Sequence, residues 1–313
     1  MVVAILNNAD VYVTGSNSKF LSSDVITQFR GRGDEIHVFP LSFSEFTSAY
    51  DGTLDEAWDD YLVYGGLPLL LAMEAPEDKA EYLNSLFQKV YISDIVERHN
   101  VRNKAELDEL VDILASAVGS YTNHGKLERA FKSMKGKIIS EKTIKNYIDY
   151  LIDSFLVSKA VRYDIKGKKY IGSLSKYYFE DIGLRNARLG FRQIEPTHLM
   201  ENIIYNELRV RGYHVDVGVV EYWETKPDGK RGKKQLEVDF VATKGSEKYY
   251  IQSAFSMPTI EKINQEQRSL LSIPDSFRKI IVVGDNIRVR RDESGIITVG
   301  LRNFLLDENS LKL

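Results

Sequence analysis

The stretch from Gly136 to Asp164 constrains the fold of this 313-residue chain more than any other part. It reads GKIISEKTIKNYIDYLIDSFLVSKAVRYD, in which Ser140 can cap a helix whose apolar residues recur at helical spacing. Alternating residues from 155 to 162 then predict a strand, and the basic glycine turn DIKGKK leads to a return strand at Tyr170. Two more amphipathic helices are predicted upstream, at 105–118 and 126–134. Three helices followed by a two-stranded hairpin indicate a winged helix.

The outward face of the capped helix and the turn of the hairpin are polar and mostly basic. The side chains concerned are Lys142, Lys145 and Asn146 on the helix and Lys166, Lys168 and Lys169 in the turn. A recognition helix can lie in the major groove of DNA while the lysines of the wing contact phosphates. Duplex DNA is therefore one predicted partner. The alternative is a packing module with the same shape, whose basic face is solvated or contacts only protein.

Charge is distributed unevenly along the chain. Residues 1–100 contain six Lys/Arg against sixteen Asp/Glu, and residues 123–176 contain thirteen against five. An acidic front and a basic middle favour separate domains with different partners. The chain has no cysteine, which excludes disulfides and thiolate metal sites, and its longest apolar run, 67–73, is too short to span a membrane. We expect a cytoplasmic protein without a membrane partner.

Short elements with clear boundaries are predicted before residue 104. A strand at 10–14 and a helix at 19–29 come first, and a short strand from Glu35 ends at Pro40. Ser42 and Glu45 then have the spacing of a capping box. Two further helices are predicted, at 54–64 and 77–99, with the breaker YGGLP between them. These helices suit a small helical subdomain.

The last third of the sequence predicts an α/β domain. Its expected elements are a helix at 198–213, strands at 214–221, 236–243, 248–255 and 279–283, and a helix at 260–271. Glu201 on the first helix and Asp239 inside the strand LEVDFVA suggest a metal-dependent nuclease site, because carboxylates hold Mg²⁺ and a buried Asp needs a partner. Gln252 stands where a third carboxylate is expected, and Ala254 stands where the lysine is expected. We therefore predict a degenerate, nuclease-like domain.

Phosphate-binding motifs are missing from the sequence. No G-x-x-x-x-G-K-[ST] occurs in the chain, and the Asp-Glu pair of TLDEAW (53–58) follows no apolar strand. We interpret that pair as the acidic start of a helix. The five histidines form no His-x-x-x-His cluster.

Several motifs occur together in one order along the chain. They are YVTGSNSKFLSSD, RGR, FPLSFSEF, YGGLP, ISEKTIKNYIDYLIDSFLV, RYDIKGKKY, KYYFEDIGLRNA, ENIIYNELRVRGY and EVDFVA…YYIQSAF. In this order they resemble the prokaryotic AAA-type ATPases that carry a C-terminal domain of unknown function with a restriction-endonuclease-like fold. The resemblance implies ATP and Mg²⁺ as cofactors of the family. It also implies that Ser16 or Asn17 occupies the sensor position for the γ-phosphate and that Arg32 is a candidate arginine finger.

In that family a phosphate loop and an Asp-Glu strand come before the sensor strand, and here they would lie before Met1. We therefore expect the C-terminal portion of such a protein, without ATP hydrolysis by this chain alone. The predicted fold class is α/β and α+β multidomain. The expected domains are a remnant of the ATPase core (1–50), a helical lid (51–104), a winged helix (105–190) and a nuclease-like domain (191–313).

The expected function is binding of DNA or protein through the last two domains, with a protein partner or a homo-oligomer as further expectations. Two alternatives remain open. One is a Mg²⁺-dependent DNA nuclease that uses Glu201 and Asp239, and the other is a plain protein-interaction module.

Overall fold

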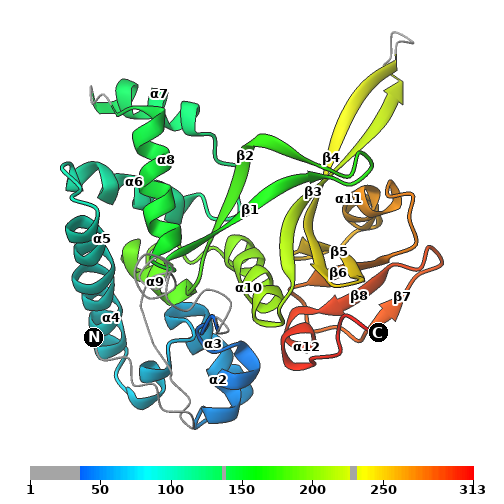
Figure 1. Ribbon diagram of the computed structural model, residues 1–313. Coiled ribbons are helices and arrows are strands. Elements are labelled where there is room, and N and C mark those ends of the chain that lie inside the picture. Colours follow the sequence, from blue (N-terminus) through cyan, green and yellow to red (C-terminus); the bar gives the residue numbers. More distant parts are fainter. Residues whose placement is uncertain (1–35, 136–138, 226–230) are drawn as a thin grey trace, which may run out of the picture.

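A computed structural model describes residues 36–135, 139–225 and 231–313 of the chain. One mixed sheet of eight strands runs through these ranges in the order β2-β1-β3-β4-β5-β6-β8-β7 (Figure 1). The strands are β1 (Val157–Asp164), β2 (Lys169–Phe179), β3 (His214–Thr225), β4 (Arg231–Lys244), β5 (Glu247–Ala254), β6 (Arg278–Val283), β7 (Arg290–Arg291) and β8 (Ile297–Gly300). The predicted mixture of helices with a sheet is confirmed at this level.

Helices surround this sheet. They are α2 (Phe43–Ala49), α3 (Leu54–Tyr64), the 3₁₀ helix η1 (Pro68–Ala72), α4 (Pro76–Ser85), the π-helical η2 (Leu86–Ile92), α5 (Ser93–Arg98), α6 (Lys104–Ser116), α7 (His124–Lys135), α8 (Glu141–Asp153), α9 (Ile182–Arg188), α10 (Pro196–Val210), α11 (Ile260–Leu271) and α12 (Leu301–Leu306). In the part of the chain that the structure describes, no helix is long and apolar enough to cross a membrane.

The two helices that begin before residue 60 are each capped by side chains at their first turn. Ser42 and Glu45 form a reciprocal capping box at the start of α2, and Thr53 and Glu56 form another at the start of α3. The acidic pair of TLDEAW therefore begins a helix, as predicted. The strand predicted from Glu35 to Pro40 is wrong over the residues described, because 36–42 form no strand. The Leu41 N–H there bonds to the Gly66 carbonyl of a turn instead.

The hairpin β1–β2 is an integral part of the sheet. β1 pairs with β2 in antiparallel fashion and with β3 in parallel, so that Arg162 lies opposite Val217. Side chains of the hairpin alternate between two cores: Tyr177 and Phe179 pack with the α4–α9 helices, whereas Tyr178 packs with α10. The sheet thus crosses the boundary predicted at residue 190 without interruption.

Helix α9 connects three parts of the chain. Asp181 caps α9 by accepting the Leu184 N–H, and its other oxygen accepts the Gly66 N–H from the YGGLP turn. Asn186 donates to the carbonyls of Leu62 and Val63 at the end of α3. Within the described residues, the polar side chains of FEDIGLRNA therefore serve to hydrogen-bond backbone groups of α9, α3 and the YGGLP turn.

Candidate functional site

Glu201 and Asp239, which are far apart in the sequence, reach the same buried region. Glu201 lies on α10 and accepts a hydrogen bond of 2.6 Å from the Tyr178 hydroxyl of β2. Asp239 lies on β4, is 7% exposed and accepts the Ser253 N–H of β5 at 2.7 Å. The charge of Glu201 acts on Asp239, so the two predicted carboxylates are neighbours.

Lys176 of β2 supplies the ammonium group that the nuclease-like sequence motif lacks. Its Nζ lies 2.9 Å from Glu201 Oε1 and 2.6 Å from Glu237 Oε1. The side chain of Lys176 is only 4% exposed, whereas that of Glu237 is 33% exposed, so Glu237 is the more open side of the cluster. We call Lys176, Glu201, Glu237 and Asp239 the carboxylate cluster.

Burial and mutual charge set the protonation of the carboxylate cluster. Burial by itself would lower the pKa of Lys176, but the charges of Glu201, Asp239 and Glu237 outweigh burial and raise it above its usual value. Burial raises the pKa of Asp239 well above its ordinary range, and the Glu201 charge adds to this rise. The pKa of Tyr178 is raised by burial and then by Glu201, so this hydroxyl remains a hydrogen-bond donor.

Gln252 does not join the carboxylate cluster, which corrects the expectation that it takes the third ligand position. Its Oε1 accepts from the Ser269 hydroxyl at 3.2 Å, and Ser269 belongs to α11 on the other face of the sheet. The physical reason is a register shift between β3 and β4: Gly218 lies opposite Val238, but Asp216 lies opposite Val241. The extra β4 residue is a bulge, and it re-aims Asp239 toward α10.

The carboxylate cluster does not fit a divalent cation in the arrangement described. Lys176 already provides the positive charge that the carboxylates require, at hydrogen-bond distance from two of them. Within the described ranges, no group of three or more His, Asp or Glu side chains is placed to hold a metal ion.

Sequence reasoning missed both Lys176 and Glu237. Lys176 comes from a strand that precedes Glu201 in the chain, so no fixed motif spacing could include it. The one signal was a lysine inside the aromatic strand SLSKYYF, where a buried ammonium needs anionic partners. Glu237, two residues before Asp239, carried no such signal because its side chain is partly exposed.

The six side chains predicted to contact DNA occupy two separate surfaces. Lys142 and Lys145 are exposed on α8 and Asn146 is half-buried, while Ile144, Ile148 and Leu151 of the same helix are buried. Lys166 and Lys168 are exposed in the turn after β1, and Lys169 is exposed at the start of β2. The turn lies beside β3, because Lys166 Nζ donates to the Glu221 carbonyl at 2.8 Å. Figure 1 shows this turn well away from the start of α8. The structure therefore does not bring the two groups together.

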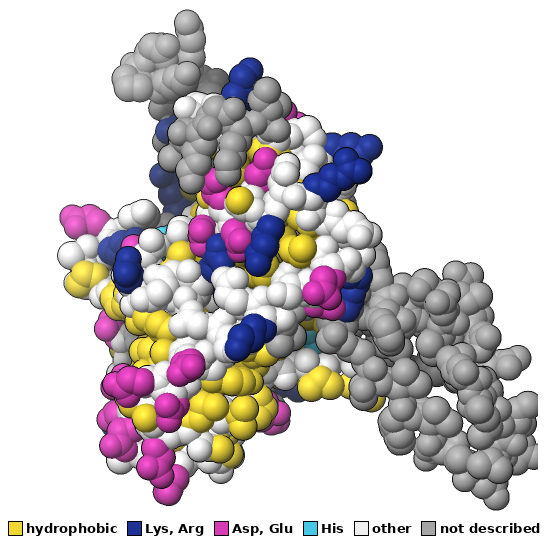
Figure 2. Space-filling model, turned by 90° about the vertical axis from the view of Figure 1, so that its left-hand side faces the viewer, with side chains coloured by type: hydrophobic (Ala, Val, Ile, Leu, Met, Phe, Trp, Pro, Cys, Tyr) yellow, Lys and Arg dark blue, Asp and Glu magenta, His cyan; other side chains and the backbone are white. Residues whose placement is uncertain are grey.

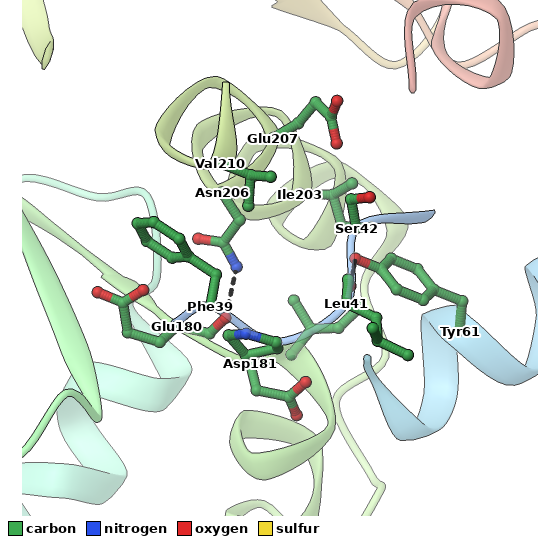
Figure 3. A pocket seen from close by; sticks show the side chains of 12 residues that line it. Phe39, Leu41, Ser42, Tyr61, Glu180, Asp181, Ile203, Asn206, Glu207 and Val210 are labelled. Atoms are coloured by element: carbon green, nitrogen blue, oxygen red, sulfur yellow. Dashed lines mark hydrogen bonds between the residues drawn. The ribbon is translucent and has the colours of Figure 1, made fainter. Parts of the chain in front are cut away.

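A small cavity lies where the segment 39–42 crosses α10 (Figure 3). Its walls include Phe39, Ile203 and Asn206, and Asn206 donates to the Glu180 carbonyl. Its volume of about 10 Å³ holds one water at most. The cavity is a small gap in the packing between this segment and α10, too small to hold a ligand. Ser16, Asn17 and Arg32, the predicted ATP-site residues, lie outside the described residues.

Three family models match successive parts of this chain. Residues 2–47 match an AAA domain, residues 55–195 match the domain of unknown function DUF8612, and residues 197–304 match the domain of unknown function DUF4143.

Two curated relatives are similar over most of the chain. An uncharacterized protein of Haemophilus influenzae is 35% identical over 88% of this chain and 66% of its own length. The uncharacterized protein MJ1544 of Methanocaldococcus jannaschii is 29% identical over 81% of this chain and 57% of its own length. The chain thus spans about two thirds or less of these relatives.

A solved structure, protein VC1899 from Vibrio cholerae, aligns with 76% of this chain and 56% of that chain at 12% identity. Its TM-score is 0.26, too low to support a structural argument. Taken in order along the sequence, the matches make this chain similar to part of an AAA domain followed by two domains of unknown function.

Proposed function

We propose that this chain is a duplex-DNA-binding portion of an ATPase-like protein and that its carboxylate cluster does not cleave DNA. The observation that carries the proposal is the exposed basic face of α8. Lys142 and Lys145 project from a helix whose opposite face is buried, and within the described residues neither has an ion pair. A helix with one face anchored in a core and the other basic suits the major groove.

The neighbouring helix enlarges this basic face. Lys126, Arg129 and Lys132 are exposed on α7, which packs against α8. Figure 2 shows Lys and Arg side chains in its upper half, at the level of α7 and α8, and only acidic charges among the side chains at its lower end. Clustered cations of this kind bind phosphates and release counterions. The order α6, α7, α8 and then β1–β2, with a bridge from Thr122 to Ser175, supports the winged-helix hypothesis.

The buried ion pairs of Lys176 support the second half of the proposal. An ammonium held by Glu201 and Glu237 already places a positive charge beside these two carboxylates, where a metal ion would have to bind. Cleavage by metal-activated water would require that Lys176 first withdraw.

A plasmid assay with Mg²⁺ tests both parts of the proposal. The purified chain should retard supercoiled plasmid without nicking it, and Asp239→Ala should behave in the same way. Metal-dependent nicking that disappears in Asp239→Ala would overturn the non-cleaving assignment, and lack of retardation at low salt would overturn DNA binding. The two failures are distinguishable because one alters the topology of the plasmid and the other alters its mobility.

A further inference from the structure

Strands β3 and β4 extend beyond the rest of the sheet as a two-stranded arm (Figure 1). Trp223 lies on this arm and is 66% exposed. Its backbone pairs with β4, but among the described residues its indole has no ring contact or hydrogen bond. Its neighbour Tyr222 points to the opposite face, where its hydroxyl accepts from Arg268 of α11 at 2.7 Å. One face of the arm is therefore packed, and among the described side chains the face that carries Trp223 is open.

The turn that follows β1 brings positive charge to the base of the arm. Lys166 donates to the carbonyl of Glu221, two residues before Trp223, and this bond leaves its charge unneutralised. Lys168 and Lys169 are exposed, and no ion pair of these three lysines occurs in the described ranges. Arg162 of β1 donates to the Gln235 side chain on β4 and fastens the turn to the arm.

Two described acidic side chains near the base of the arm already accept hydrogen bonds. Glu221 accepts from Gln235, and the largely buried Asp164 accepts the Gly167 N–H inside the turn. The arm and the adjoining β1–β2 turn thus combine an exposed indole with ammonium groups that have no ion pair in the described ranges. This combination suits a nucleic acid with accessible bases, because bases stack on aromatic side chains while lysines contact the phosphates between them. In a duplex the bases are already stacked on one another, so an indole stacks on unpaired bases.

We propose that the open face of the arm, with Trp223 and the lysines of the β1–β2 turn, binds single-stranded nucleic acid. This surface is separate from the α8 face, so the inference does not depend on the proposed duplex binding. The three lysines predicted to act as a DNA-contacting wing would then serve the arm instead of α8.

Tryptophan fluorescence tests this inference directly, because the chain has only two tryptophans. Trp58 of α3 is partly buried and packs against the core, with its ring 5.0 Å from the Phe43 ring, so Trp58→Phe leaves Trp223 as the reporter. Titration of this variant with an oligothymidylate at low salt should quench the emission to saturation, and added salt should reverse the quenching. Trp223→Ala, assayed with a labelled oligothymidylate, should bind roughly 5–100-fold more weakly.

Matched variants separate this surface from α8. Trp223→Phe should retain most of the affinity because it keeps an aromatic ring. Lys166→Glu with Lys168→Glu should weaken single-strand binding by a larger factor than Lys142→Glu with Lys145→Glu does. Equal affinity of Trp223→Ala and the unmodified chain would overturn the proposal. Self-association that Trp223→Ala abolishes, without quenching by oligothymidylate, would assign the arm to a second copy of the chain and would also overturn it.

Discussion

Lys176 balances the charge of a buried site that the sequence assigns only to carboxylates. Its ammonium group and its ion pair with Glu201 are largely withdrawn from solvent, and Glu237 is the more exposed partner. Loss of one partner of such a pair leaves the other charge buried and uncompensated.

Lys176→Met should therefore lower the free energy of unfolding by about 3–5 kcal/mol in urea titrations. Adding Glu201→Gln to this variant should restore part of the loss, because one uncompensated charge is then removed. A loss below about 1 kcal/mol for Lys176→Met would contradict the role assigned to the ammonium group.

Asp181 predicts a pH dependence of stability. Burial raises its pKa to about 6, although hydrogen bonds from the N–H groups of Gly66, Leu184 and Gly183 oppose the rise. The folded chain therefore binds this proton more tightly than the unfolded chain, whose aspartate titrates near 3.9. The resulting stabilisation is fully present below about pH 4 and is lost as the pH rises through about 6, with a change of up to ~3 kcal/mol.

Urea midpoints measured between pH 4 and 7 check this prediction. Asp181→Asn should be less stable throughout, since it loses a capping oxygen, but its stability should fall less with rising pH. The exposed Asp51→Asn serves as the control and should keep the slope of the unmodified chain. Identical slopes in all three proteins would refute the assignment to Asp181.

At the scale of elements, the contact of α9 with the YGGLP turn is a close backbone approach. A Cβ at Gly183 would lie 1.7 Å from the Tyr64 carbonyl oxygen, so α9 would have to move away from α3. Gly183→Ala should destabilise the chain by at least ~3 kcal/mol in thermal or urea unfolding. Gly172→Ala is the matched control, because no atom lies within 4 Å of its added carbon. Equal unfolding midpoints for the two variants would show that the α9 contact is not tight.

Local patterns predicted the long elements well. The helix at 260–271 has the predicted bounds, and Ser140 caps α8. Of the apolar residues at helical spacing on α8, Ile144, Tyr147, Ile148 and Leu151 are buried and Ile152 is half-buried. The strands β7 and β8 and helix α12 were missed because they are too short for a periodic pattern.

Non-local features could not be predicted in the same way. The parallel pairing of β1 with β3 joins residues far apart in the chain, and the bulge that re-aims Asp239 depends on the strand beside it. Of the predicted residues, Glu201 and Asp239 lie together in the carboxylate cluster, whereas Gln252 bonds to α11 instead. Lys176 was not predicted. That these residues form a functional site stays a prediction. The boundaries of the four domains stay predictions.

At the scale of the whole molecule, charge separates the two ends. No Lys or Arg occurs between residues 33 and 78, which include α2 and α3, whereas α7 and α8 carry exposed lysines. A polyanion is therefore repelled from one end and attracted to the other, which should orient duplex DNA along α8.

The salt dependence of duplex binding tests the central claim most directly. Fluorescence anisotropy with a labelled duplex should show affinity falling steeply with salt. Lys142→Glu with Lys145→Glu should weaken binding at least ~10-fold and reduce the slope of log affinity against log salt by about 2. Lys89→Glu with Lys312→Glu makes the same charge change at exposed residues of η2 and of the C-terminal end and should have little effect. Equal losses in both double variants, or no loss in either, would contradict a duplex-binding surface on α8.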